Sequence, residues 1–202
     1  MNAIGANRMT KEANTIISCY KQLNDEAFAA LMAIARFRVY QPGERFLRLG
    51  ERSLRSAFVL SGLLKSVWYD TDGTERIIEL LEVGDFAANC ESHNKRAPSE
   101  YEIIPACACR LLVFENTALE ELCRRYAELM ELGTMLTQAI LFRRAEHTSI
   151  ISMKAPLDRY TYVVNHRPQL LQQINLTELA KYLYVTRETI SRCRSAMSRR
   201  AG

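Results

Sequence analysis

The sequence predicts an α+β protein with an N-terminal antiparallel β-roll or jelly-roll barrel and flanking helices, then a long helix, then a small C-terminal helix-turn-helix domain. Glycine-marked turns at intervals of about ten residues between Val39 and Phe114 are typical of an antiparallel sandwich or barrel. Apolar residues return to helical spacing from Tyr126 to about Met153. From Leu176 onward, the spacing predicts two short helices joined by a tight turn.

In the N-terminal part, the pattern changes from helical to extended. Apolar residues at three- and four-residue steps predict a helix from Thr15 to Tyr40. Within the barrel, apolar and polar residues alternate over 63–69, and the segment 70–74, Asp-Thr-Asp-Gly-Thr, leads into the apolar run 77–81. This order of segments predicts a β-hairpin.

A long helix is expected to follow the barrel, after a short helix over 117–123. Its apolar stripe runs at alternating four- and three-residue steps through Leu129, Gly133, Leu136 and Ile140. Such a seam on a helix outside a compact barrel predicts a homodimer interface, and the glycine would permit close helix approach. The alternative is that the stripe packs only on its own barrel. Pro156 ends the helix, because proline disfavours helical continuation through the residue before it.

Length and composition fit this division of the chain. We assign residues 1–125 to the barrel domain, 126–154 to the dimerisation helix and 155–202 to the helix-turn-helix domain. An apolar fraction of 48% is enough for a hydrophobic core. The sequence has no run of eighteen apolar residues and no apolar signal core at its start, so we expect no membrane association and a cytoplasmic protein.

The helix-turn-helix carries residues suited to reading DNA. Leu179, Ala180 and Leu183 give the first helix an apolar face, and Ile190 is expected to point inward from the second, the recognition helix over 186–198. Thr186 is placed to cap that helix. An arginine can donate two hydrogen bonds to guanine, and a glutamate can accept one from cytosine. The expected base contacts are Arg187, Glu188 and Arg192, and the expected phosphate contacts are Thr177, Thr186, Thr189, Ser191 and Arg194.

Charge favours DNA binding over the alternative of a solvated helical hairpin. From Leu176 onward there are two acidic residues and six basic ones, which together give +4, equal to the net charge of the whole chain. The remainder is therefore neutral. A polyanionic partner attracts such a patch, whereas a structural hairpin does not require it. The six basic residues are Lys181, Arg187, Arg192, Arg194, Arg199 and Arg200.

The sequence shows no pattern of catalytic or metal-binding residues. The six cysteines lack CxxC pairs, and Cys107 and Cys109 alternate in an expected strand, where we predict buried free thiols on one face. His93, His147 and His166 are isolated, and no His-x-His pair occurs. We expect no metal, no cofactor and no enzymatic activity. A barrel enzyme with an accessory helical tail is the weakest alternative.

Several motifs, taken in order, resemble one known family over almost the full chain. Pro42-Gly43-Glu44, Asp72-Gly73-Thr74 and Gly84-Asp85-Phe86 match the glycine landmarks of its sensor barrel, and 186–192 is similar to its recognition helix. The family is the Crp/Fnr family of bacterial transcription regulators. The resemblance implies a homodimer that grips a pseudo-palindromic site on double-stranded DNA through two recognition helices about one turn apart. It also implies recruitment or obstruction of RNA polymerase.

The same resemblance raises the question of a cyclic nucleotide. Family members that bind one use a glutamate for the ribose and an arginine for the phosphate, both from the loop after Gly-Asp-Phe. In this sequence those positions are Asn89 and Ser99, with Glu100 next to the second, so neither ligand is present and a phosphate would lie beside a carboxylate. A shifted frame offers Glu91 and Arg96, at a shorter spacing than the motif.

Thr148 and Ser149 on the long helix are similar to the family pair that contacts the adenine. The candidate ligand pocket therefore comprises Asn89, Ser99, Glu100, Thr148 and Ser149. We expect a regulator that acts without cyclic nucleotide and whose small-molecule effector, if it has one, is unknown. The alternative is a regulator that responds to a cyclic nucleotide or another small molecule through the barrel pocket.

Two departures from the family pattern affect the DNA-binding end. The bend of the motif usually contains a glycine, and Tyr184 stands there at a cost of about 1 kcal/mol unless its ring packs well. The segment 166–175 is short and poor in β-branched residues, so we do not expect the usual wing hairpin.

Overall fold

The structure is a computed structural model that describes residues 3–199. It begins with helices α1 (Ala3–Ser18) and α2 (Asp25–Ile34), followed by strand β1 (Arg36–Tyr40). The single helix expected over 15–40 is therefore wrong. The side chain of Asn24 caps α2 by accepting a hydrogen bond from Ala27 N at 2.8 Å. The segment 36–40, rich in aromatic and β-branched residues, pairs with strand β7 (Cys109–Glu115) instead of continuing a helix.

The expected antiparallel barrel is confirmed and consists of two sheets, with strand orders β1-β7-β2-β5 and β4-β3-β6. The predicted hairpin is also confirmed, because β3 and β4 are antiparallel neighbours. Across its turn, Asp70 Oδ1 accepts a hydrogen bond from Thr74 N at 3.0 Å. The remaining strands are β2 (Arg55–Ser61), β3 (Leu64–Tyr69), β4 (Glu75–Leu81), β5 (Phe86–Ala87), β6 (Glu102–Pro105) and β7 (Cys109–Glu115).

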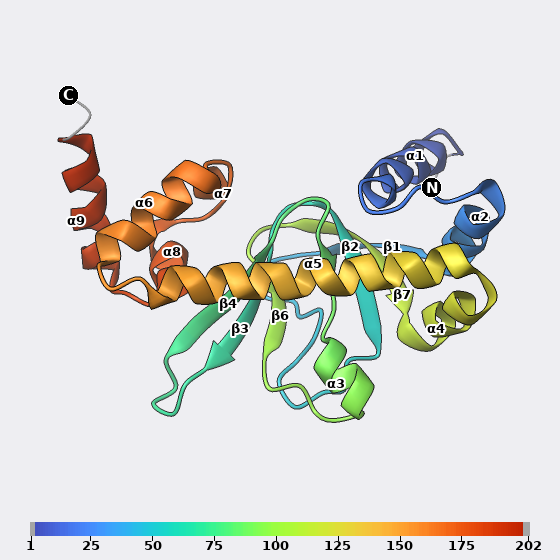
Figure 1. Ribbon diagram of the computed structural model, residues 1–202, viewed down its shortest axis with the longest axis horizontal. Coiled ribbons are helices and arrows are strands. Elements are labelled where there is room, and N and C mark those ends of the chain that lie inside the picture. The colour runs from blue at the N-terminus through green and yellow to red at the C-terminus, as the bar shows by residue number, and fades with distance from the viewer. Residues whose placement is uncertain (1–2, 200–202) are drawn as a thin grey trace.

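Helices surround the barrel and form the C-terminal part of the molecule. The long helix is α5, which has 26 residues and runs past the barrel to the terminal helices, as Figure 1 shows. The α+β fold class is confirmed. The helices after β5 are α3 (Cys90–Lys95), α4 (Asn116–Arg125), α5 (Ala127–Ser152), α6 (Pro156–His166), α7 (Leu170–Gln173), α8 (Leu176–Leu183) and α9 (Arg187–Ser198).

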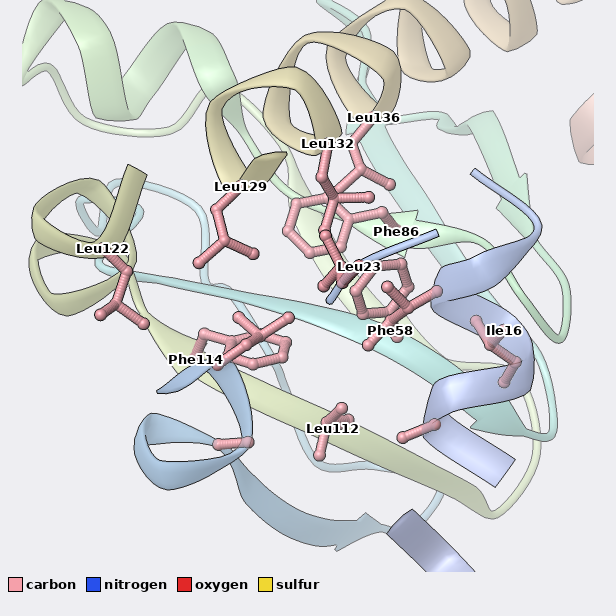
Figure 2. Packing of buried hydrophobic residues seen from close by; sticks show 14 of the residues in the cluster. Ile16, Leu23, Phe58, Phe86, Leu112, Phe114, Leu122, Leu129, Leu132 and Leu136 are labelled. Atoms are coloured by element: carbon pink, nitrogen blue, oxygen red, sulfur yellow. The ribbon is translucent and has the colours of Figure 1, made fainter. Parts of the chain in front are cut away.

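Helix α5 contributes to two hydrophobic cores. Its first half buries Leu129, Leu132 and Leu136 in a core that also contains Phe58 and Phe86 (Figure 2). Its second half buries Ile150 in a core with residues of β3, β4, α6, α8 and α9. The barrel and the terminal helices are therefore joined by apolar packing as well as by the chain.

The residues of the predicted dimer seam lie mainly on the face of α5 that is turned toward the barrel. Leu129, Leu136 and Ile140 are only 1%, 4% and 6% exposed, so they pack on the chain's own barrel. The apolar stripe is the inward face of an amphipathic helix, which was the alternative interpretation. Gly133, the fourth residue of the seam, is half-buried. The large apolar side chains that α5 exposes are a different set: Met130, Met135, Leu141 and Phe142.

Gly62 lies where the end of β2 passes close to the start of β7. Its φ is +85°, and a Cβ atom there would lie 2.4 Å from Ala108 O and 2.8 Å from Cys109 Sγ. This position therefore accepts only glycine. Because β7 begins at Cys109, Cys107 precedes the strand, and the expectation that both thiols lie on one strand face is wrong. Cys109 is buried and Cys107 is half-buried, and both are free thiols.

We predict that Gly62→Ala lowers the free energy of unfolding by about 2–5 kcal/mol, since left-handed strain of about 1–2 kcal/mol adds to overpacking of about 1–3 kcal/mol. Gly73→Ala is the matched control, because Gly73 has a φ of +81° but open space around the position of a Cβ atom. Urea unfolding should give a loss of about 1–2 kcal/mol for the control. Equal losses in the two variants would contradict the close contact at Gly62.

Candidate nucleic-acid interface

The terminal motif has the expected helix-turn-helix geometry. Asn175 caps α8 by accepting a hydrogen bond from Glu178 N at 2.9 Å. Thr186 caps α9 as predicted, because its Oγ1 accepts a hydrogen bond from Thr189 N at 3.2 Å. The segment 184–186 is the whole connection between the two helices, so the direction of α9 follows from that of α8.

Apolar contacts fix which face of α9 points outward. Leu179, Ala180 and Leu183 of α8 are buried, as the sequence predicted. Ile190 and Cys193 of α9 are buried in the same core, so the expected inward position of Ile190 is confirmed. The opposite face of α9 is left in solvent.

That outward face carries the three predicted base-reading residues. Arg187, Glu188 and Arg192 are all exposed and lie in the first two turns of α9. Arg192 Nη2 donates a hydrogen bond to Thr189 Oγ1 at 3.3 Å, which holds the guanidinium beside the helix start. Of the predicted phosphate contacts, Thr189 is half-buried, and the other four, Thr177, Thr186, Ser191 and Arg194, are exposed.

The bend of the motif is held by an unusual residue. Tyr184 has a φ of 56° and a ψ of 47°, which confirms the left-handed conformation expected at this position. Its ring packs edge-on against the His147 ring, with centroids 5.5 Å apart, and the Arg76 guanidinium lies 5.2 Å from its centroid. These ring contacts offset the backbone strain.

His147 supports the same bend from α5. Its Nε2 lies 2.8 Å from Tyr182 O, and its ring stacks on the Tyr182 ring with centroids 4.4 Å apart. Burial lowers the pKa of His147 below its ordinary value, so the neutral form is favoured in the folded protein. Sequence reasoning treated this histidine as isolated, because its partners are 35 residues or more away along the chain.

Lys181, one of the six basic residues from Leu176 onward, is paired with carboxylates of the barrel and of α8. Lys181 Nζ is bound to Glu75 Oε2 at 2.7 Å and to Glu178 Oε1 at 3.3 Å, so its charge faces the barrel instead of DNA. Arg200 lies outside the described residues. The exposed cations of α9 and its C-terminal end are Arg187, Arg192, Arg194 and Arg199.

A half-buried arginine that the sequence did not indicate connects the terminal helices to the barrel. Arg167 Nε donates to Glu82 Oε2 at 3.2 Å, and Arg167 Nη1 donates to the Tyr182 hydroxyl at 3.2 Å. The short helix α7 occupies the segment where a wing would be expected in the family. No local pattern could reveal the Glu82 contact, since 85 residues separate the partners.

The candidate ligand residues do not form one site. Asn89 and Ser99 do lie together, but they are bonded to each other, with Asn89 Nδ2 donating to Ser99 Oγ at 2.8 Å. Both are only 3% exposed, and Asn89 Oδ1 also accepts from Ser92 N at 3.0 Å to cap α3. The side chain of Glu100 is in solvent.

The other candidates face elsewhere. Thr148 and Ser149 are exposed on α5, and their hydroxyls donate to helix carbonyls at 2.9 and 3.0 Å. In the shifted frame, Glu91 pairs with Lys95 Nζ at 2.7 Å and Arg96 is the left-handed C-cap of α3. A cavity of about 580 Å³ between α3, α4 and α5 is lined by Asn89 but not by Ser99.

A polar cluster that the sequence did not indicate occupies the adjoining part of the barrel. Glu79 is 4% exposed, and its carboxylate accepts from Arg143 Nε at 3.1 Å and from Ser66 Oγ at 3.3 Å. Arg144 Nη2 donates to the Tyr101 hydroxyl at 2.5 Å, and burial raises the pKa of Tyr101 to about 12. Glu79 is therefore satisfied within the chain, whereas the buried Nε of Arg144 has no hydrogen-bond partner among the described residues.

We predict that the Tyr184 ring, and not its backbone, stabilises the bend. Tyr184→Ala keeps the left-handed strain and loses the ring, whereas Tyr184→Gly loses both. Chemical unfolding should therefore rank the alanine variant lowest, about 1–2 kcal/mol below the glycine variant, with the glycine variant within about 1 kcal/mol of the wild type. A glycine variant well above the wild type in stability would show that the ring does not offset the strain.

Within residues 3–199, no three His, Cys, Asp or Glu side chains gather closely enough to hold a metal ion. No helix in that part of the chain is long and apolar enough to cross a membrane. The chemistry on the outward face of α9 is hydrogen bonding by arginine, glutamate and hydroxyl groups.

Known proteins resemble this chain both in the sequence of the barrel and in the fold of almost the whole molecule. Residues 37–126 match the cyclic nucleotide-binding domain family. No curated protein sequence matches the chain significantly. FixK2 from Bradyrhizobium japonicum superposes with a TM-score of 0.72 at 17% identity, over 83% of this chain and 86% of that one.

Two further solved structures are similar to this chain in fold over most of its length. The c-di-GMP-responsive global regulator CLP from Xanthomonas campestris has a TM-score of 0.68 at 16% identity, over 88% of this chain and 93% of that one. A protein described as a transcriptional regulator of the Crp/Fnr family from Eubacterium rectale has a TM-score of 0.68 at 15% identity, over 87% and 84%. Residues 37–126 are therefore similar to the cyclic nucleotide-binding domain family, and the whole chain has the fold seen in these solved regulators.

Proposed function

We propose that this protein is a homodimeric, sequence-specific DNA-binding transcription regulator that reads a pseudo-palindromic operator through the recognition helix 186–198. The observation that carries this proposal is the outward face of α9. Its inward residues are fixed in a core, its start is capped by Thr186, and Arg187, Glu188 and Arg192 are free to enter a major groove. The regulator-type fold supports the same function.

Base reading and positioning fall to different side chains. Arg187 and Arg192 would each donate two hydrogen bonds to a guanine, and Glu188 would accept from a cytosine amino group. Thr177, Thr186, Thr189, Ser191 and Arg194 would hold phosphates on either side and set the register of the helix in the groove. Contact with RNA polymerase would follow from the position of the bound dimer.

We assign dimerisation to the exposed face of α5, in place of the buried seam. Leu141 and Phe142 are 61% and 73% exposed, and Met130 and Met135 lie exposed on the same helix. Exposed apolar groups of this size mark protein contacts. A second copy is the proposed occupant, because α5 leads directly into the DNA-binding helices and a two-fold contact along it would present two copies of α9 to one duplex.

Residues 1–125 would serve as the sensor-type domain, 126–154 as the dimerisation helix and 155–202 as the DNA-binding domain, and none would act as an enzyme. We propose regulation without cyclic nucleotide. The support is the hydrogen bond between Asn89 and Ser99, which occupies the two positions where the family has its glutamate and arginine.

We predict that Arg187→Ala and Arg192→Ala each weaken operator binding by about 1–3 kcal/mol, or about 5- to 150-fold, and relax the preference at one base position. Arg194→Ala should weaken binding to all sequences alike, because its proposed contact is a phosphate. Fluorescence anisotropy with labelled duplexes measures both effects. Arg52→Ala, an exposed arginine on the barrel, is the control and should bind as the wild type does. Wild-type specificity in Arg187→Ala would refute its assigned role.

We predict that Phe142→Glu converts the dimer to a monomer and removes high-affinity operator binding, because a buried unpaired carboxylate at the helix contact is strongly unfavourable. Val39→Glu is the control, since Val39 is 61% exposed on β1 and the variant also places a glutamate at an exposed apolar position, away from α5. Sedimentation velocity separates the two species. A dimer that persists in Phe142→Glu would rule out this face as the interface.

A further inference from the structure

The DNA-binding helices are docked on the barrel. Figure 1 shows α8 beside β4, and the two elements are in contact. Val67 of β3 and Ile77 of β4 share a core with Leu179 and Leu183 of α8, and all four are at most 2% exposed. This apolar contact holds the parts together, but apolar burial alone is non-directional.

A closed ring of four charges borders this contact. Lys65 of β3 and Glu75 of β4 come from the barrel, and Glu178 and Lys181 come from α8. Lys65 Nζ binds Glu75 Oε1 at 3.1 Å and also binds Glu178 Oε2. Lys181 Nζ binds Glu75 Oε2 at 2.7 Å and Glu178 Oε1 at 3.3 Å.

The ring restricts how α8 can sit on the hairpin. Each carboxylate uses one oxygen for each lysine, so a rotation or a slide of α8 breaks at least two contacts. The four side chains are only 10% to 28% exposed, which limits screening by water and salt. Burial alone would raise the pKa of Glu75, but the hydrogen bonds from Lys181 and Lys65 outweigh it and hold this pKa below its ordinary value.

We propose that this charge ring positions the recognition helix, so that Lys65, Glu75, Glu178 and Lys181 set the direction in which α9 leaves the barrel. The inference rests on the proposed DNA-binding function. In a dimer built on α5, the same direction sets the separation of the two recognition helices and hence the half-site spacing that the protein accepts.

Only a short segment separates α8, which carries half of the charge ring, from α9, so the orientation of α8 determines that of α9. Glu178 and Lys181 lie on α8, and only the segment 184–186 separates that helix from α9. Arg159 Nη1 donates to Leu183 O at 2.9 Å, which fixes the end of α8 from α6. If the ring is broken, α9 samples more directions, and the apparent operator affinity falls with the fraction of molecules that are competent to bind.

The ring suits a test by charge inversion. Glu178→Lys combined with Lys181→Glu leaves the net charge and the attraction within α8 unchanged, but it places like charges against Lys65 and Glu75. Lys65→Glu combined with Glu75→Lys makes the reciprocal change in the hairpin. The variant with all four changes restores the alternation of charge, so the three variants and the wild type form a double-mutant cycle that cancels effects confined to one element.

We expect each paired inversion to lower operator affinity about tenfold, within the range of about 2- to 150-fold that coupled charge pairs show. The fourfold variant should recover most of that loss. Affinity for non-specific DNA should stay the same in all variants, because the ring has no net charge. Operators with half-sites moved by one base pair should bind relatively better to the paired inversions than to the wild type.

Two results would overturn the proposal. One is a folded paired inversion, checked by circular dichroism and melting, that binds the operator with wild-type affinity and spacing. The other is a fourfold variant that recovers nothing. If a paired inversion does not fold, Glu75→Gln removes one charge with little change in shape, and wild-type affinity and spacing in that variant would equally overturn it. Failure of the proposed function is distinguishable, since the wild type itself would then prefer no DNA sequence.

Discussion

A single helix, α5, is buried in two hydrophobic cores at once, and this burial fixes how the barrel and the terminal helices are arranged. Its 26 residues span about 39 Å. Leu129, Leu136 and Ile140 anchor α5 in the barrel, while His147 and Ile150 anchor its second half beneath the terminal helices. A rigid rod fixed at both ends leaves the barrel and the helix-turn-helix little freedom to move apart. It also leaves one face of the rod uncovered, and we assign that face to a second copy.

The interior of the barrel fits this fixed arrangement. Asn89 and Ser99 are bonded to each other, and Glu79 is bonded to Arg143 and Ser66, so these groups are satisfied within the chain. Arg144 donates to the neutral Tyr101 hydroxyl, and its buried Nε has no hydrogen-bond partner among the described residues. A second set of charged residues joins the barrel to α8, and it comprises Lys65, Glu75, Glu178 and Lys181. These ion pairs support the proposal that contacts within the chain set the direction of α9.

Local features of this molecule could be predicted from sequence, and long-range ones could not. Three local features each depend on only a few neighbouring residues: the Thr186 cap, the hairpin turn at 70–74 and the left-handed conformation of Tyr184. The apolar spacing on α5 predicted a buried face, but spacing alone does not tell whether a barrel or a second helix covers it. The charge count from Leu176 onward included Lys181, whose partner Glu75 is 106 residues away. The prediction of one helix over 15–40 was wrong for two reasons. Asn24 begins a new helix as its cap, and pairing with β7 determines the extended conformation of 36–40.

In the proposed dimer, two copies of α9 are held at a fixed separation by α5 and the barrel, and both read one duplex. Selection of bound sequences from a random pool of double-stranded DNA tests this arrangement. We expect a two-fold symmetric consensus with half-sites about one helical turn apart, and with guanines facing the positions of Arg187 and Arg192. Recovery of no preferred sequence, or of a single half-site without symmetry, would contradict it.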